Sequence, residues 1–206
     1  MTPMGKTEKV EGRKRPDPKG PARFTPLPEV PLESPMGDKI AWAQRVYEEF
    51  GKELLSDPAV SDLLKKFERA ALDARSEMLR TGIVEMCGDC DLHEGGSCCG
   101  RGIENRYSGV LLLLNLLLGR TLSTERQDPS GCLFLGKRGC LLLAREVICV
   151  NYLCGRITEA VDPALLAPLR EREGKELDLL FLLTERVRGC LKKRTSNIEH
   201  PTSNIE

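Results

Sequence analysis

Aromatic residues and histidines are scarce in this chain of 206 residues. Aromatics make up 4% of the sequence, and only two histidines are present. Leucine, valine and alanine must therefore fill the core, and side chains suited to acid–base catalysis are few. Because a leucine-rich, aromatic-poor composition favours helices over sheets, we predict a mostly α fold: a small helical domain.

The sequence also lacks an excess of charge and a long apolar segment. Its 31 basic residues balance 31 acidic residues, so no global charge attracts nucleic acid or an anionic membrane. The longest apolar run, 110–118, is interrupted by Asn115 and is far shorter than the ~20 residues of a membrane-spanning helix. No apolar stretch follows Lys6 and Lys9, so we expect no secretory signal. We predict a cytoplasmic protein with no nucleic-acid partner and no membrane span.

Both ends of the chain differ in composition from the middle. Residues 1–36 hold eight of the 13 prolines, which prevent regular helices, so we predict a disordered, Pro-rich arm there. The sequence of 195–201 begins again at Thr202, and two such short units cannot build a repeat fold. We predict a disordered repeat tail over 193–206, with one domain over 37–192.

Apolar residues recur at helical spacing through most of that domain. Asp38 is the expected N-cap of the first helix, Ser56 or Asp57 is expected to open the second, and Gly82 is expected to end it. The periodicity is broken over 87–104, where five glycines lie between 88 and 102. The expected helices cover about 38–54, 57–81, 105–119, 141–153 and 162–192, the third being apolar on nearly all sides and therefore central.

Nine cysteines stand out in a sequence without a predicted secretory signal. Eight of them form two groups separated by 32 residues without cysteine. Clustered cysteines in a reducing compartment are more often metal ligands or redox groups than disulfides. We therefore predict two cysteine-rich metal-binding regions that meet in space, with the ligands Cys87, Cys90, Cys98, Cys99, Cys132, Cys140, Cys149 and Cys154.

These eight thiols suffice for one or two sites, because zinc and iron–sulfur sites typically take four protein ligands each. Neighbouring side chains diverge, so one thiol of the pair Cys98-Cys99 is expected to face the Cys87/Cys90 site and the other a second site or a supporting role. His93 is expected to be an exposed histidine and Cys190 a core residue. The cationic side chains that could offset thiolate charge are those of Arg101, Lys137, Arg138 and Arg145.

Known cluster and nucleotide-binding motifs do not account for this arrangement. The spacing fits neither the ferredoxin pattern Cys-x2-Cys-x2-Cys nor the radical-SAM pattern. A Gly-x-Gly-x-x-Gly sequence and a phosphate-binding loop are both missing. The metal, the number of sites and the catalytic residues therefore stay open at this level.

The cysteine segments resemble those of the YkgJ-type cysteine-cluster (CxxCxxCC) family. The likeness covers 87–155. It consists of the Cys87-Gly-Asp-Cys90 and Cys98-Cys99 pieces, then Cys132-Leu-Phe-Leu with Gly139-Cys140-Leu, and Arg145 with the Cys149-x4-Cys154 ending. The spacer between Cys90 and Cys98 is longer than is usual there, and Glu146 replaces a proline.

This resemblance implies a zinc- or iron-chelating domain, with relatives among flagellin lysine N-methylases. Three hypotheses follow. The first is a protein that holds iron or an iron–sulfur cluster in a redox or sensing role. The second is a structural zinc domain that contacts a protein partner. The third is an S-adenosylmethionine-dependent protein-lysine methylase acting on a protein substrate.

Overall fold

The computed structural model of the chain describes residues 28–93 and 98–199. The structure is mostly α-helical, as predicted. Seven α-helices are joined by one 3-10 helix and one two-stranded ribbon within these residues. The elements are α1 (Met36–Ser56), α2 (Pro58–Arg80), α3 (Ile83–His93), the 3-10 helix (Ile103–Arg106), α4 (Gly109–Leu117), β1 (Leu135–Gly136), β2 (Gly139–Cys140), α5 (Val147–Asn151), α6 (Gly155–Ala160) and α7 (Pro163–Glu199).

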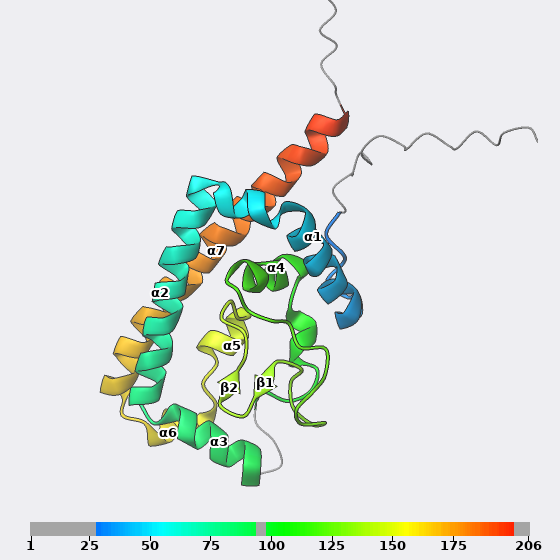
Figure 1. Cartoon of the computed structure of the whole chain (residues 1–206). Helices are drawn as coiled ribbons and strands as arrows, with labels where there is room; N and C mark the ends of the chain where they lie inside the picture. The colour runs from blue at the N-terminus through cyan, green and yellow to red at the C-terminus, as the bar shows by residue number, and fades with distance from the viewer. Residues whose placement is uncertain (1–27, 94–97, 200–206) are drawn as a thin grey trace, which may run out of the picture.

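The two longest helices, α2 and α7, pack against each other in opposite directions (Figure 1). Asp57 precedes α2 and forms an ion pair with Arg186 in the second half of α7, at 2.6 Å. Glu77, near the end of α2, pairs with Arg172 near the start of α7, at 3.2 Å. The start of α2 is thus paired with a later part of α7, and the end of α2 with an earlier part of α7. The two helices therefore form an antiparallel scaffold.

Local sequence signals explain where α2 begins and ends. The side chain of Asp57 accepts hydrogen bonds from the backbone N–H groups of Ala59 and Val60, at 3.0 and 2.9 Å, and Pro58 occupies the first turn. Gly82, which follows the helix, has φ +73°, a conformation that a residue with a Cβ rarely adopts. Of the two predicted starts, Ser56 and Asp57, the structure selects Asp57, and it confirms the predicted end at Gly82.

Helix α4 forms the centre of the main hydrophobic core. Leu112, Leu113 and Leu114 are fully buried, which confirms the predicted central position of this helix. It packs mainly against α1 (Figure 1), and the core also includes α2, α7 and the segment 132–144. A leucine-rich helix with no polar face is stable only when it is surrounded in this way.

A second, smaller core lies at the end of the scaffold where α3 and α6 meet (Figure 1). Its buried members are Ile83, Ile157, Val161 and Leu169. Side chains that pack on it include Met78, Met86, Cys87, Leu153, Cys154 and Leu166. This core is too small to contribute much hydrophobic free energy by itself.

Several predicted boundaries are corrected by the structure. Helix α1 starts at Met36 with Pro35 as N-cap, so Asp38 is not the cap. The region from 87 that was expected to break periodicity is helical as far as His93. The 105–119 helix begins only at Gly109, after the 3-10 turn, and Ser108 caps it by accepting from Leu111 N–H at 3.2 Å. The expected helix over 141–153 is reduced to 147–151.

The ends of the domain extend beyond the predicted limits. Glu29, assigned to the arm, accepts a hydrogen bond from the backbone N–H of Val110 at 2.9 Å. At the other end, α7 continues to Glu199, past the predicted limit at 192. Residues 1–27 and 200–206 lie outside the described part of the chain. None of the described helices combines the length and apolarity that a membrane crossing requires.

Candidate metal centre

All nine cysteines lie within the described residues, as thiols. Cys87 and Cys90 are on α3, and Cys98 and Cys99 follow the segment after it. Cys132 precedes β1, Cys140 ends β2, Cys149 lies in α5 and Cys154 is the N-cap of α6. The fold therefore brings the two sequence groups to the same side of the scaffold.

Four of these cysteines form what we call the inner thiol group: Cys99, Cys132, Cys140 and Cys149. An isolated bridge pairs Gly100 with Gly131, and the N–H of Cys132 donates to the carbonyl of Cys99 at 2.7 Å. The β1–β2 pairing places Cys140 opposite Leu135. The contacts of Gly100 with Gly131 and of Cys132 with Cys99 join segments that are more than 30 residues apart in the sequence.

Burial dominates the electrostatics of the inner thiol group. Burial raises the pKa of Cys132 to about 12, and the pKa values of Cys99 and Cys149 to about 11. The neighbouring thiols add to the effect, since Cys140 and Cys149 each raise the pKa of Cys99. Gathered, buried thiolates repel one another, so the ionised group is favourable only when a cation compensates its charge.

Two hydrogen-bond donors point at sulfurs of this group. The backbone N–H of Phe134 donates to Cys132 Sγ at 3.5 Å, and the hydroxyl of Tyr107 donates to Cys149 and lowers its pKa against the effect of burial. Tyr107 and Phe134 pack edge to face, with ring centroids 5.3 Å apart. Donors fixed toward sulfur stabilise thiolate rather than thiol.

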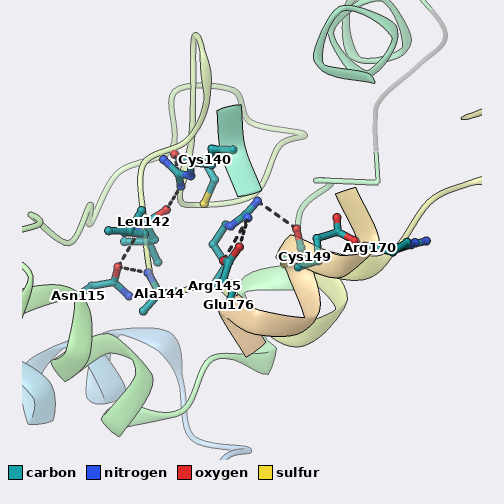
Figure 2. A network of polar contacts seen from close by, with 11 residues as sticks. Asn115, Cys140, Leu142, Ala144, Arg145, Cys149, Arg170 and Glu176 are labelled. Carbon is teal, nitrogen blue, oxygen red and sulfur yellow. Dashed lines mark hydrogen bonds and ion pairs between the residues drawn. The ribbon is translucent and has the colours of Figure 1, made fainter. Parts of the chain in front are cut away.

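Two arginines, the half-buried Arg75 and the buried Arg145, hold the peptides that carry Cys140 and Cys149. Arg75 on α2 donates to the carbonyls of Cys140, at 3.4 Å, and Leu142. Arg145 donates to the carbonyl of Cys149 at 3.4 Å and to both carboxylate oxygens of Glu176 at 3.3 Å. Figure 2 shows Arg145 between Glu176 of α7 and Cys149. The cationic side chains thus connect both scaffold helices to the inner thiol group.

Asn115 fixes the segment between these two cysteines to the core. Its side-chain nitrogen donates to the carbonyls of Leu111 at 3.0 Å and Ala144 at 2.8 Å. Its side-chain oxygen accepts from the N–H groups of Leu143 at 2.9 Å and Ala144 at 3.0 Å (Figure 2). Most of the segment between the two cysteines forms no helix or strand. The fully buried amide therefore provides backbone hydrogen-bond partners that regular secondary structure would otherwise supply.

The other four cysteines form the outer thiol group: Cys87, Cys90, Cys98 and Cys154. Cys87 and Cys90 are three residues apart on α3, so they share a face of that helix. The thiol of Cys98 donates a hydrogen bond to Cys154. Burial raises the pKa of Cys87, and the charges of Cys154, Cys98 and Cys90 raise it further, in that order.

The inner and outer thiol groups are not the same as the two groups of cysteines along the sequence, because one cysteine of each sequence group lies with the other group in space. Cys99 joins the cysteines that follow it in the sequence, and Cys154 joins those that precede it. Cys98 and Cys99 therefore face different groups, and the two groups are neighbours, because Cys87 and Cys98 also raise the pKa of Cys99.

The thiols are gathered, but they are not arranged as a finished ligand set. Among the described residues, no three His, Cys, Asp or Glu side chains are placed so that they could hold a metal ion. Binding one ion or cluster in either group requires the sulfurs to move closer together. The donor chemistry fits a soft or borderline metal, since thiolates select zinc, copper(I) and iron–sulfur clusters.

The remaining sequence candidates take minor positions. His93 is exposed, as expected, and Cys190 packs against the main core. Cys190 also lines a small hollow with Phe50 and Asp57, on another part of the scaffold. Of the four predicted counter-charges only Arg145 is buried beside a thiol, whereas Arg101, Lys137 and Arg138 are exposed.

Sequence reasoning missed Arg75, Tyr107 and Glu176. Glu176 could have been noticed, because it lies seven residues after Leu169 and four before Leu180, on the inner face of α7. A carboxylate at such a position requires a buried partner. Nothing in the pattern around Arg75 or Tyr107 indicates their contacts with the cysteine segments.

Comparisons with protein-family models, with curated proteins and with solved structures found no match to this chain.

Proposed function

We propose that this chain holds iron, as an iron–sulfur cluster, through the inner thiol group, in a redox or sensing role. The observation that carries the proposal is that four cysteines from separate segments gather around buried hydrogen-bond donors. Tyr107 and the N–H of Phe134 each donate to a sulfur of the group. Such hydrogen bonds are a principal means by which proteins tune cluster potentials.

The ligand spacing of the inner thiol group differs from that of a typical structural zinc site. Structural zinc sites are typically built from pairs spaced Cys-x2–4-Cys, whereas the successive gaps here, between Cys99, Cys132, Cys140 and Cys149, are all much longer. Arg75 and Arg145 supply positive charge next to thiolates that would otherwise be unfavourable. A reducing compartment such as the cytoplasm keeps the thiols available for the metal.

Nothing in the described residues specifically favours the methylase hypothesis that the resemblance implies. The proposal therefore stops at metal binding with a redox or sensing role. It includes no substrate and no methyl transfer.

The test is elemental analysis of protein purified without oxygen, together with its absorbance spectrum. We expect iron, inorganic sulfide and a broad band near ~400 nm, as for thiolate-bound clusters. Cys132→Ser should remove most of the iron and the band, and Cys190→Ser, outside both thiol groups, should leave them unchanged. A colourless protein that contains zinc at the inner thiol group would overturn the proposal in favour of the structural zinc hypothesis.

A further inference from the structure

One side of the α2–α7 scaffold is open to solvent in the described part of the chain. Figure 1 shows α1, α4, α5 and the ribbon on one side of α2, with α3 and α6 at its end. On the other side, exposed positions recur at helical spacing along both scaffold helices. We call the exposed residues within 62–80 of α2 and within 171–185 of α7 the outer face. It consists of two parallel rows, one on each helix.

The two rows of the outer face carry opposite charge. The α2 row has four basic residues and two acidic ones, whereas the α7 row has three acidic residues and one basic one. Four of these charged side chains take part in no ion pair or side-chain hydrogen bond with another described residue. They are Arg69 and Asp73 on α2 and Lys175 and Asp178 on α7. The outer face therefore offers unpaired charges of both signs, sorted by helix.

These four charges lie at matching levels along the scaffold. The two ion pairs that join the ends of α2 to α7 fix the register of the helices. Interpolation between those pairs places Arg69 level with Asp178, and Asp73 level with Lys175. A two-fold rotation about an axis parallel to the helices keeps these levels and lays α2 of one copy on α7 of the other. It sets each basic residue opposite an acidic one, and does so twice.

Apolar side chains also belong to the outer face. Phe181 and Leu182 on α7 are 65% and 52% exposed, and Leu72 on α2 is 46% exposed. The area is sufficient for a dimer. Helix α2 has 23 residues and is therefore about 35 Å long, and two packed helices are about 20 Å wide. The outer face thus offers about 700 Å² per copy, close to the ~800 Å² per partner of a standard interface.

We propose that the outer face is an interface between two copies of this chain, related by a two-fold axis that runs parallel to α2 and α7. Arg69 of each copy pairs with Asp178 of the other, and Asp73 pairs with Lys175. The alternative two-fold arrangement, with α2 on α2, sets basic residues against basic residues and is unfavourable. The interface includes neither thiol group, so it does not depend on the iron proposal.

Sedimentation equilibrium of the full-length chain, under reducing conditions that exclude intermolecular disulfides, tests the dimer. We expect twice the chain mass of 22.9 kDa at micromolar concentration. Arg69→Glu and Asp178→Arg should each raise the dissociation constant about ten-fold or more, because like charges then face each other twice. The double variant exchanges the two charges and should bind nearly as tightly as the unsubstituted protein. Lys52→Glu, an equal charge change on an exposed residue of α1, should have no effect.

Leu182→Ser gives a second test that does not involve charge. It should weaken the dimer, while circular dichroism shows the helix content of the unsubstituted protein, because Leu182 is half exposed in the single chain. The inference is overturned if the unsubstituted chain is a monomer even at high micromolar concentration, or if neither charge reversal changes the dissociation constant. A double variant that stays as weak as its single changes also overturns it, because Arg69 and Asp178 then do not face each other.

Discussion

Asn115 and Ala144 exchange two hydrogen bonds. The amide nitrogen of Asn115 donates to the carbonyl of Ala144 at 2.8 Å, and the N–H of Ala144 donates to the amide oxygen at 3.0 Å (Figure 2). Both residues are fully buried. The side chain thus pairs with the backbone as a neighbouring strand would, and it places the segment that leads from Cys140 to Cys149.

Replacing this amide should be strongly destabilising. Asn115→Leu keeps a similar volume but leaves the N–H groups of Leu143 and Ala144 without their acceptor in a dry core. An unsatisfied buried group costs about 1–3 kcal/mol, so we expect the free energy of unfolding to fall by about 3 kcal/mol or more. Urea unfolding followed by circular dichroism measures it. A loss below about 1 kcal/mol would show that the segment finds other partners.

The helical elements of this fold could be predicted from local sequence. The apolar periodicity of α2, its cap Asp57 and its terminating Gly82 are all signals within the segment itself, and the structure confirms them. The leucine run of α4 was recognisable for the same reason. Hydrophobic periodicity and caps act over a few residues, so a single sequence reveals them.

The arrangement of the cysteines could be predicted only in part. Sequence spacing identified all eight candidates, but the exchange between Cys99 and Cys154 depends on the Gly100–Gly131 bridge and on the cap of α6. The segment before Cys149 looked helical, yet Asn115 satisfies its backbone from another element. Contacts between segments distant in sequence leave no periodic signal.

The buried pair of Arg145 and Glu176 should be costly to break. Glu176 is fully buried, so its removal leaves a buried guanidinium without its carboxylate, a change that costs about 3–5 kcal/mol in comparable pairs. We expect Glu176→Ala to lower the free energy of unfolding by about 3 kcal/mol. Lys66→Ala, which breaks the exposed pair with Asp62 at 2.7 Å, should cost less than about 1 kcal/mol.

A double-mutant cycle identifies the cause of the Glu176 effect. Arg145→Met combined with Glu176→Leu removes both charges and should be more stable than Glu176→Ala alone. If the double variant is as unstable as the sum of its single changes, the pair is not coupled and the losses come from packing.

Two glycines on helices should respond in opposite ways to alanine. A Cβ on Gly109 would lie 2.6 Å from Trp42 Cε3, so Gly109→Ala must push α4 away from α1, at about 1–3 kcal/mol. A Cβ on Gly174 meets nothing within 4 Å, and Gly174→Ala should stabilise α7 by about 0.5–1 kcal/mol. Thermal unfolding of both variants measures the difference. Equal shifts would contradict the close α1–α4 packing.

Asp57 should make stability depend on pH in the acid range. The N–H of Val60, then the side chain of Arg186, hold the pKa of Asp57 below its ordinary value of 3.8. A carboxyl whose pKa is lowered in the folded state stabilises the fold above the ordinary value, and this contribution is lost as the pH falls through the lower, folded-state value. Asp57→Asn keeps the capping oxygen and removes the charge, so it should be less stable than the unsubstituted protein at neutral pH.

The difference in stability between Asp57→Asn and the unsubstituted protein should disappear at acid pH. As the pH falls from 3.8 through the lower folded-state pKa of Asp57, the carboxyl becomes protonated and resembles the amide, so the urea midpoints of the two proteins should converge, while all other carboxyls titrate equally in both. A difference that stays constant from pH 7 to acid would show that the charge of Asp57 has no part in the stability of the α2–α7 pair.

Tyr107 should act on the proposed iron centre as a positioning residue. Its buried hydroxyl donates to Cys149 and accepts from the backbone N–H of Glu146, so Tyr107→Phe removes two hydrogen bonds and should cost about 1–2 kcal/mol of stability. In the iron-loaded protein, the sulfur of Cys149, as a ligand of the cluster, also loses a hydrogen-bond donor. Because hydrogen bonds to sulfur favour the more electron-rich, reduced state, the reduction potential should become more negative.

The reduction potential of the iron centre distinguishes this role of Tyr107 from a purely structural one. Tyr47→Phe, on α1 and away from both thiol groups, serves as the control and should leave the potential unchanged. Both variants are measured by redox titration of the visible absorbance, with the iron content determined on the same samples. If Tyr107→Phe lowers stability but leaves the potential where it was, its hydroxyl supports the fold and does not reach a metal-bound sulfur.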